Sequence, residues 1–569
     1  MTQVLARAIY VHRSALFAFL ALQPFNGYAQ RAVSIRVDST KHLGSLHAPW
    51  AYFGYDEPNS TYTNNGKKLV NELAASSRVP VHIRTHNLLT TGNGTFGLKF
   101  GSTNVYTEDP FGRPVYNWTI VDKILDTYLA LGAKPLVELG FMPKALSVQP
   151  EPYTPTFHNP SDFKNYYLGW SYPPKDYSKW GELVYQLVKH SVNRYGRAEV
   201  ETWDWEVWNE PNVDYWHGTA QEYDKLYDYS AAAVKRALPA THIGGPASTS
   251  PRNKKAAAFL QQFLEHCSSG TNYATRTKGA PLDFVSFHAK GSPDINGGHV
   301  RMGLSKELED ADQGFKIVRS FNKFQNLPVI LSEADPEGCA ACSSKDNPAN
   351  AYRNGPLYPT YTAMAEKELL DLAEHWRANL QGILTWAFEF EDKDYFAGYR
   401  DLATNGIDKP ILNFFRMAGM LTGDRISVQS DGAQNLDRLL ENGVRDKPVI
   451  DGLATRRNNE ISLLLWNYLD DDAIGPDANV ELTFSDLPAN TSRLLLRHFR
   501  IDRTHSNAYT LWKEMGSPEA PTGEERERLE AAGQLELFDS PHWINSRNGR
   551  ASVSFSLPLQ AVSLVQLSW

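Results

Sequence analysis

The sequence predicts an α/β protein, a (β/α)8 TIM barrel with an accessory C-terminal β-sandwich domain. Eight short apolar runs, typical of buried parallel strands, alternate with amphipathic segments at helical spacing. Two of these runs end in a glutamate, and barrel enzymes carry their active-site residues at the carboxyl ends of the strands. After about residue 425, the pattern changes to alternating apolar and polar residues between turn clusters, which indicates antiparallel strands. With 569 residues, the chain is long enough for both domains.

The predicted barrel strands are short, and enough chain follows several of them for a helix to return along the outside. The strands are expected at 50–55, 81–85, 134–139, 202–209, 242–246, 282–287, 329–332 and 382–388. Helices are expected at 120–129, 180–195, 223–238 and 304–321. No glycine-rich phosphate loop follows a strand, which weakens the alternative of an open nucleotide-binding sheet. We therefore assign residues 46–425 to the barrel.

The accessory domain is assigned to residues 426–569. Its alternating strands are expected at 461–468, 480–484, 493–499, 551–557 and 562–569, with one charged helix at 522–532. Residues 33–37 alternate in the same way. Segment 30–45 is therefore expected to add an N-terminal strand to the β-sandwich.

Residues 1–29 are predicted to form a secretory signal peptide. Arg7 and Arg13 precede an apolar run at 15–22, and a small-residue cleavage site ends at Ala29. The run is too short to cross a bilayer, and no later run approaches about 20 apolar residues, so no membrane span is expected. The mature protein is expected to be secreted, or delivered to a lysosome- or vacuole-like compartment.

Sequons and cysteines agree with a secretory route. Candidate glycosylation sites are Asn59, Asn93, Asn117 and Asn490. Cys339 and Cys342 form a Cys-Ala-Ala-Cys motif for which an oxidising compartment makes a disulfide plausible. The flanking pattern does not fit a thioredoxin-like redox site, and three cysteines without suitable histidine spacing predict no metal site. The net charge of −8 and the lack of a Lys/Arg-rich run argue against nucleic acid as a partner.

Two glutamates carry the predicted chemistry. Glu210 lies in the segment Trp208-Asn209-Glu210-Pro211, which closes an aromatic strand, and Glu333 lies in Ser332-Glu333-Ala334-Asp335-Pro336 after a second apolar strand. Glycoside hydrolysis usually requires two carboxyl groups that flank the scissile bond. Either glutamate alone could form an ordinary salt bridge at a strand end. As a pair on opposite sides of one barrel mouth, they predict a glycosidase.

Several segments together resemble glycoside hydrolase family 39, which contains β-xylosidases and α-L-iduronidases. Besides the two glutamate segments, the matching stretches are Arg84-Thr85-His86, Ser286-Phe287-His288, Arg500-Ile501-Asp502 and His505-Ser506-Asn507-Ala508-Tyr509. The resemblance implies that Glu210 is the acid/base and Glu333 the nucleophile of a retaining mechanism that needs no cofactor. It also implies that Asn209 contacts the sugar 2-hydroxyl and that His86 and His288 line the subsite for the cleaved sugar. Without the resemblance, Asn209 could simply cap its turn, and each histidine could be a buried core residue.

The substrate class rests on two basic residues. The resemblance assigns Lys290 and Arg400 to a substrate carboxylate in the iduronidase branch, but acidic residues crowd the segment from 391 to 401. We therefore favour a β-D-xylosidase-type exo-glycosidase on plant-type oligosaccharides, in which Lys290 bonds acids such as those at 391–394. An α-L-iduronidase-like hydrolase of acidic sugars is the second hypothesis. A secreted carbohydrate-binding protein with an inactive barrel is the alternative from another class.

Overall fold

Eight parallel strands form the closed barrel that the sequence predicts. The computed structural model describes residues 31–97, 101–153, 168–296, 299–386, 388–473, 475–489 and 491–569. In barrel order the strands are β2 (Tyr52–Tyr55), β3 (Val81–Thr85), β6 (Ala133–Leu139), β7 (Asp204–Val207), β8 (His242–Ser248), β9 (Phe284–Lys290), β12 (Pro328–Asp335) and β13 (Asn379–Trp386). β13 pairs with β2 and closes the ring. The predicted signal peptide and Asn490 lie outside the described residues.

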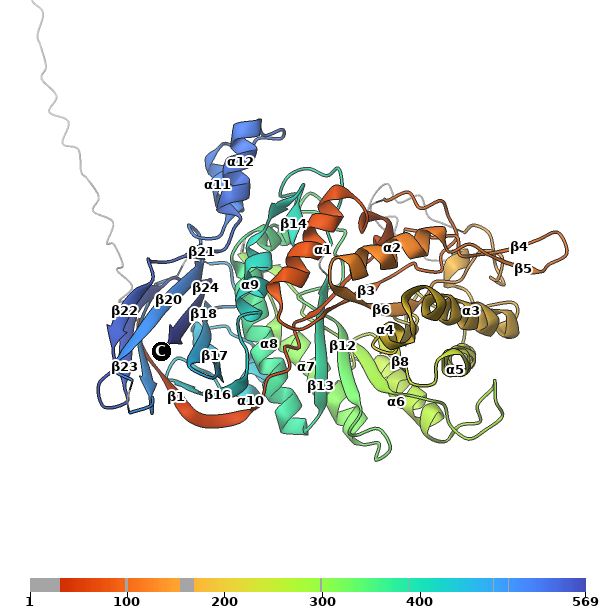
Figure 1. Ribbon diagram of the computed structural model, residues 1–569, viewed down its shortest axis with the longest axis horizontal. Helices are drawn as coiled ribbons and strands as arrows, with labels where there is room; N and C mark the ends of the chain where they lie inside the picture. The colour runs from red at the N-terminus through yellow and green to blue at the C-terminus, as the bar shows by residue number, and fades with distance from the viewer. Residues whose placement is uncertain are drawn as a thin grey trace, which may run out of the picture.

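Helices surround the barrel on its outer side (Figure 1). They are α1 (Asn64–Ser76), α2 (Thr119–Ala130), α3 (Tyr177–Tyr195), α5 (Ala220–Ala237), α6 (Lys254–Ser269), α7 (Leu304–Arg319), α8 (Leu357–Trp376) and α9 (Pro410–Ala418). The four predicted helices are confirmed as α2, α3, α5 and α7. Local capping explains where two of them begin. The Asp176 side chain accepts two backbone N–H groups at the start of α3. Thr219 and Glu222 form a capping box at the start of α5.

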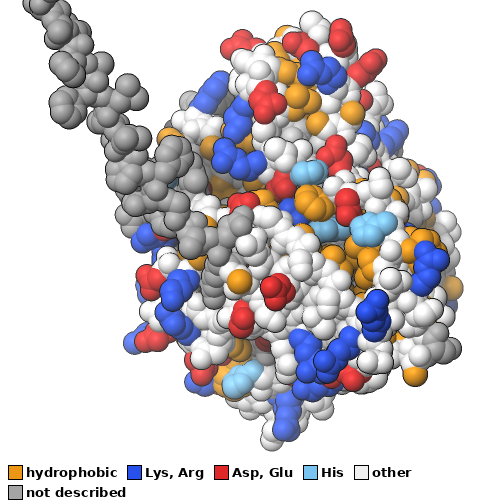
Figure 2. All heavy atoms as spheres, turned by 90° about the vertical axis from the view of Figure 1, so that its left-hand side faces the viewer, with side chains coloured by type: hydrophobic (Ala, Val, Ile, Leu, Met, Phe, Trp, Pro, Cys, Tyr) orange, Lys and Arg blue, Asp and Glu red, His pale blue; other side chains and the backbone are white. Residues whose placement is uncertain are grey.

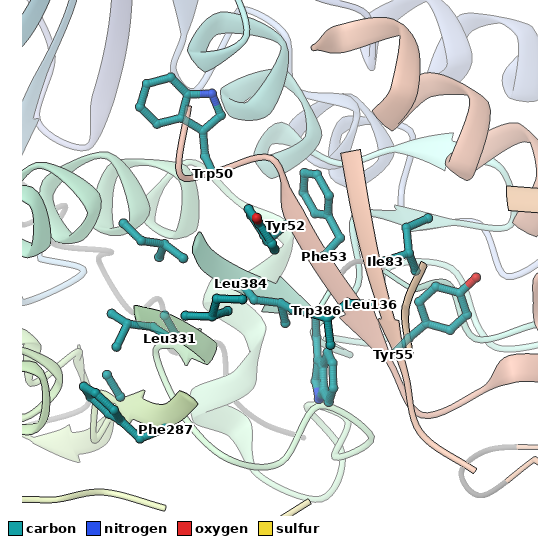
Figure 3. Packing of buried hydrophobic residues seen from close by; sticks show 14 of the residues in the cluster. Trp50, Tyr52, Phe53, Tyr55, Ile83, Leu136, Phe287, Leu331, Leu384 and Trp386 are labelled. Atoms are coloured by element: carbon teal, nitrogen blue, oxygen red, sulfur yellow. The ribbon is translucent and has the colours of Figure 1, made fainter. Parts of the chain in front are cut away.

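Large apolar side chains fill the barrel and the layer beneath its helices. Figure 3 shows Trp50 and Phe53 on the first strand segment, with Leu384 and Trp386 from the last strand nearby. Each of these four side chains is buried. Because the interior is packed, substrate can reach functional groups only at the ends of the strands.

The accessory domain is built on one ten-stranded sheet that curls into a half-barrel. The strands are β1 (Arg31–Ser45), β16 (Asp424–Ser430), β17 (Val449–Arg457), β18 (Glu460–Tyr468), β19 (Ala478–Ser485), β20 (Arg493–Ile501), β21 (Glu536–Leu537), β22 (His542–Asn545), β23 (Ala551–Leu557) and β24 (Ala561–Ser568). All five strands predicted in this region are present. β1 pairs antiparallel with β16 and parallel with β19, so it joins the two halves into one continuous sheet around a single apolar core.

A helical excursion of the accessory domain, α11 (Ala508–Glu514) and α12 (Gly523–Ala532), projects beyond the edge of the sheet (Figure 1). Ala508 and Leu529 pack with Phe396 and Ile407 from the loop after β13. This loop follows the eighth barrel strand, so the excursion supports the face of the barrel that carries the strand ends. α12 matches the predicted charged helix.

The remaining short elements lie in loops. They are β4 (Tyr106–Glu108), β5 (Pro114–Tyr116), β10 (Asp294–Asn296), β11 (His299–Arg301), β14 (Ala403–Thr404), β15 (Ile407–Asp408), α4 (Arg197–Val200), α10 (Leu436–Asn442) and the 3-10 helices Pro58–Ser60, Gly169–Ser171 and Pro348–Asn354. Among the described residues, no helix is long and apolar enough to cross a bilayer. On the face shown in Figure 2, acidic and basic side chains are interspersed.

Candidate active site

The backbone after β7 turns sharply and carries Glu210 into the mouth of the barrel. β7 ends at Val207, earlier than the predicted strand, and both Trp208 (φ 72°) and Glu210 (φ 45°) adopt left-handed conformations. Such conformations cost roughly 1–3 kcal/mol each in a residue other than glycine. The Glu210 amide donates a hydrogen bond to the carbonyl of Ala247 at 2.9 Å, which fixes the turn. The Glu210 side chain is 18% exposed, so it remains accessible from the mouth.

Glu333 approaches the same point from the opposite side of the barrel. An irregularity in the pairing of β12 with β9 places Glu333 beside His288. One carboxylate oxygen of Glu333 lies within 4.8 Å of a carboxylate oxygen of Glu210. Retaining glycosidases place their two carboxyl groups about 5–5.5 Å apart, and inverting ones about 6.5–9.5 Å apart. The separation therefore fits direct attack by one carboxylate.

His288 lies between the two glutamates. Its Nδ1 is 2.9 Å from Oε1 of Glu210 and 3.7 Å from Oε2 of Glu333. The ring is fully buried, and its Nε2 has no hydrogen-bond partner among the described residues. The structure thus places His288 beside both glutamates, and its contact with Glu210 orients that carboxyl group.

Arg84 is a residue of the site that the sequence did not single out by itself. Its guanidinium is fully buried and contacts three carboxylates, those of Glu138 at 3.0 Å, Glu333 at 3.2 Å and Glu206. It also donates to Oδ1 of Asn209 at 2.9 Å. This bond fixes the Asn209 amide beside Glu210, and it uses the side-chain oxygen that a simple turn cap would require.

His86 completes the buried network. Its Nδ1 lies 2.8 Å from Asp56, and its Nε2 lies 3.2 Å from Glu138 and 3.6 Å from Glu333. Burial alone would lower the pKa of His86, but the carboxylates of Glu138 and Asp56 outweigh it and raise the pKa to about 9. The ring packs edge-on against Trp386 with centroids 4.8 Å apart. His86 is therefore a second cationic neighbour of Glu333.

The surroundings keep Glu333 ionised. Burial would raise its pKa, but electrostatic interactions with Lys290, His288 and Arg84 and a hydrogen bond from His86 hold the pKa well below its usual range. By contrast, burial raises the pKa of the neighbouring Glu138 to about 7, even though His86 and Arg84 oppose this effect. A buried carboxylate with a lowered pKa suits a nucleophile, since it is charged across the whole neutral range.

Lys290 lies in the site, but its partners differ from those predicted. Its ammonium group is 2.6 Å from Oε2 of Glu333 and 2.6 Å from Oδ2 of Asp335. The prediction that Lys290 bonds acids at 391–394 is wrong, because β9 and β12 are adjacent and place Lys290 directly opposite Asp335. Two acids of that segment have other partners, with Glu391 accepting from Thr63 and Asn65 and Asp394 pairing with Lys345.

Arg400 lies deeper than predicted. Its side chain has no exposed surface, and it pairs with Asp335 at 3.3 Å and with Glu337 at 3.0 Å. The prediction that it lines the substrate site is therefore wrong for this structure, since Asp335 and Glu337 already occupy its guanidinium group.

The cysteine prediction is confirmed and one of the sequon predictions is corrected. Cys339 and Cys342 are joined by a disulfide in the loop after β12, and Cys267 is buried with a free thiol. Asn59 is fully buried, and its amide donates to Tyr62 and to the Ser102 carbonyl, so the folded protein has no room for a glycan there. Asn93 and Asn117 are exposed.

The residues that sequence reasoning missed share a detectable signal. Glu138 and Glu206 are charged residues inside apolar strands, at Val137-Glu138-Leu139 and Trp205-Glu206-Val207. A charge in a buried strand requires a partner of opposite charge. Arg84, in a third such strand, supplies it for both.

Among the described residues, only one group of histidine and acidic side chains is spaced closely enough to hold a metal ion, and it consists of Glu210, His288 and Glu333. The ammonium group of Lys290 and the guanidinium group of Arg84 both contact Glu333. A cation would be repelled by these two positive charges. We therefore interpret the group as a pair of reacting carboxyl groups bridged by a histidine.

A closed parallel barrel with two carboxyl groups at this separation, one of them embedded in positive charge, defines a glycoside hydrolase. The chain belongs to glycosyl hydrolases family 39, a retaining family, because the family model matches residues 33–537.

Characterised relatives cover most of the chain. It is 29% identical over 495 residues to a β-xylosidase of Geobacillus stearothermophilus, covering 83% of this chain and 85% of that protein. It is 27% identical over 416 residues to an α-L-iduronidase of Canis lupus familiaris, covering 68% of this chain and 59% of that protein. The fold matches the crystal structure of a monomeric β-xylosidase from Caulobacter crescentus CB15 with a TM-score of 0.72 at 21% identity, covering 94% and 99% of the two chains.

Proposed function

We propose that the protein is a secreted exo-glycosidase that hydrolyses O-glycosidic bonds with retention, as a β-D-xylosidase-type enzyme on plant-type oligosaccharides. The observation that carries this proposal is the pair of carboxyl groups with oxygens within 4.8 Å, one of which is surrounded by cations. Both carboxyl groups are present at the mouth of the barrel, and that of Glu210 is 18% exposed, which argues against the alternative of an inactive carbohydrate-binding protein.

The proposal gives each glutamate a role in catalysis. Glu333 attacks the anomeric carbon, and the bond to the leaving oxygen breaks while Glu210 donates a proton to that oxygen. This step forms a covalent glycosyl-enzyme ester. Glu210 then takes a proton from water, the resulting hydroxide attacks the same carbon, and Glu333 leaves as a carboxylate. Two inversions give net retention.

Neighbouring groups support both steps. The charges of Lys290 and Arg84 stabilise Glu333 as a carboxylate before attack and after release. Asn209, held by Arg84, is placed to contact a sugar hydroxyl next to the reacting carbon. His288 contacts the Glu210 carboxyl group and so holds the acid on the side of the leaving group.

Secretion is part of the proposal. The predicted signal peptide and the exposed sequons at Asn93 and Asn117 support it. The disulfide between Cys339 and Cys342 is also consistent with an oxidising compartment, because such bonds are rare where thiols are kept reduced. The same features are compatible with delivery to a lysosome- or vacuole-like compartment.

The charge balance around the two glutamates favours an uncharged sugar. Lys290 already contacts two carboxylates, those of Glu333 and Asp335, and Arg400 is shared by Asp335 and Glu337. A substrate carboxylate would therefore have to compete with fixed carboxylates of the protein for the same cations. The similarity to two curated β-xylosidases supports the same choice.

One observation favours the second hypothesis, an α-L-iduronidase-like hydrolase. The Lys290 side chain keeps 9% of its surface exposed, and an ammonium group has three donors, of which the structure uses two. The third could contact a carboxylate on C5 of the sugar. Several relatives are α-L-iduronidases.

A substrate series separates the two hypotheses. We expect the wild-type enzyme to hydrolyse an aryl β-D-xyloside with a higher kcat/KM than the corresponding α-L-arabinoside or α-L-iduronide. Lys290→Met should then lower kcat/KM for the xyloside and the iduronide by similar factors, because it removes a cation from Glu333 and not from the substrate. If a uronide were the natural substrate, the wild-type preference would reverse. The variant would also lose about 2–5 kcal/mol more on the uronide, as expected when a buried anion loses its partner.

A further inference from the structure

Six side chains of alternating charge run from the disulfide loop after β12 to Glu333. We call them the charge chain, and in order they are Arg353, Glu337, Arg400, Asp335, Lys290 and Glu333. Each contacts the next within 3.3 Å. Only the last three lie at the mouth of the site, so the first three connect it to residues well outside the catalytic pair.

The inner part of the charge chain divides one cation between two acids. Lys290 is 2.6 Å from both Glu333 and Asp335. Asp335 is buried and also faces Arg400 at 3.3 Å, while its other oxygen accepts from the Thr385 hydroxyl at 2.8 Å. Because Arg400 neutralises part of the charge on Asp335, Lys290 remains available to Glu333.

In the outer part of the charge chain, Glu337 contacts two cations, Arg400 and Arg353. Glu337 lies 3.0 Å from Arg400 and 2.6 Å from Arg353, and the Tyr352 hydroxyl donates to its second oxygen. Arg353 has no exposed side-chain surface and donates to the carbonyls of Cys339 and Cys342, each at 2.8 Å. Arg353 thus ties Glu337 to the disulfide loop and neutralises part of its charge.

We propose that Arg353 and Glu337 are positioning residues, which act through Arg400 and Asp335 to keep Lys290 on Glu333. A buried charge that loses its partner draws on the nearest remaining one. Without Arg353, Glu337 would draw Arg400 away from Asp335, and Asp335 would in turn draw Lys290 away from Glu333. This inference rests on the proposed function, because it takes Glu333 as the nucleophile.

Several charged groups face Glu333, and Lys290 is the one that the proposal expects to move. From the strands packed around it they are Arg84 and His86 on β3, Glu138 on β6, Glu210 after β7, and His288 and Lys290 on β9. On β12 itself the neighbour is Asp335. Arg353 also lies near Asp401, which is paired with Lys409.

The pH dependence of kcat/KM tests the proposal. Glu333 must be ionised to attack, so activity falls as the pH drops through its pKa, which gives the acid limb of the profile. Arg353→Met should move this limb to higher pH by roughly 0.5–1 unit, because a compensating positive charge is lost. Glu337→Gln should move the acid limb to lower pH. Without the negative charge of Glu337, Arg400 pairs with Asp335 alone, and Lys290 then interacts more strongly with Glu333. The opposite directions are the signature of the charge chain, since general loosening of the loop would move both in the same direction.

Two further variants complete the experiment. Arg353→Lys keeps the charge, so its acid limb should lie between those of the wild type and Arg353→Met. If Arg353→Met does not fold, Arg353→Lys and Glu337→Gln together test the proposal. Arg425→Met is the matched control, because Arg425 is also an ion-paired arginine of low exposure, with Asp371 as its partner, and lies outside the chain. Acid limbs that do not move, that move in the same direction in both variants, or that move equally in the control would overturn the proposal. A Glu333→Gln enzyme that remains active would instead overturn the proposed function.

Discussion

Replacing Glu333 by glutamine is expected to lower kcat on every glycoside that the wild-type enzyme accepts by roughly 10⁴-fold or more, as is usual for loss of a nucleophile. The amide has nearly the same shape, but it carries no charge and cannot form the glycosyl ester. The loss should be equally complete for good and poor leaving groups, because no first step remains. Steady-state kinetics on an aryl glycoside and an alkyl glycoside measure the loss for a good and a poor leaving group.

A matched variant separates chemistry from folding. Glu366 is a buried glutamate on α8, outside the site, and burial raises its pKa well above the usual range. Because burial favours the uncharged form of Glu366 and the residue lies outside the site, Glu366→Gln should retain activity. Both variants should unfold at temperatures close to that of the wild type. A Glu333→Gln enzyme that keeps more than about a tenth of the wild-type activity would show that another group attacks the sugar.

Replacing Glu210 by glutamine is expected to produce losses that depend on the leaving group. A dinitrophenyl glycoside needs little protonation, so its first step should proceed at nearly the wild-type rate and the glycosyl-enzyme should accumulate. A substrate with a poor leaving group should lose roughly 10²–10⁴-fold in kcat/KM, the usual contribution of general acid catalysis. Pre-steady-state measurements should show a burst with the first substrate and none with the second.

A small anionic nucleophile provides the control for the Glu210 variant. Azide needs no general base, so it should release the accumulated glycosyl-enzyme and give a glycosyl azide of retained configuration. Equal losses on activated and unactivated substrates, without rescue by azide, would contradict the role of Glu210 as acid/base.

The barrel and its two glutamates could be predicted because both depend on local patterns. A buried parallel strand appears as a short apolar run, and Glu210 and Glu333 each follow such a run directly. The network behind them could not be predicted in the same way. Arg84 contacts Glu138, Glu206 and Glu333, and the four residues lie on four different strands. These contacts depend on how the barrel closes.

The contact between Lys290 and Asp335 follows from strand geometry that is visible in the sequence. Glu333 and Asp335 are two positions apart on one strand, so their side chains point to the same face. β9 is the strand before β12 in the barrel, and the register places Lys290 opposite Asp335. The prediction that Lys290 bonds the acidic segment at 391–394 is wrong, because a run of acidic residues in the sequence does not by itself lie close to a given lysine in the fold.

The architecture of the accessory domain depends on pairing between distant segments. The strand near residue 33 is predicted from its alternation, but its partners are β16 and β19, roughly 400 residues further along the chain. Alternation reveals that a strand has one buried face and not which strands it will join. The curled single sheet is therefore visible only in the structure.

Trapping the covalent intermediate tests the proposed chemistry most directly. A 2-deoxy-2-fluoro-β-D-xyloside with an activated leaving group slows the second step more than the first, so it should inactivate the enzyme with a stoichiometry of one. Mass spectrometry of the digested protein should place a single fluoroxylosyl group on Glu333, and no label should form in Glu333→Gln. A label on any other carboxylate, or a product of inverted configuration without labelling, would contradict the assignment of Glu333 as the nucleophile of a retaining β-xylosidase.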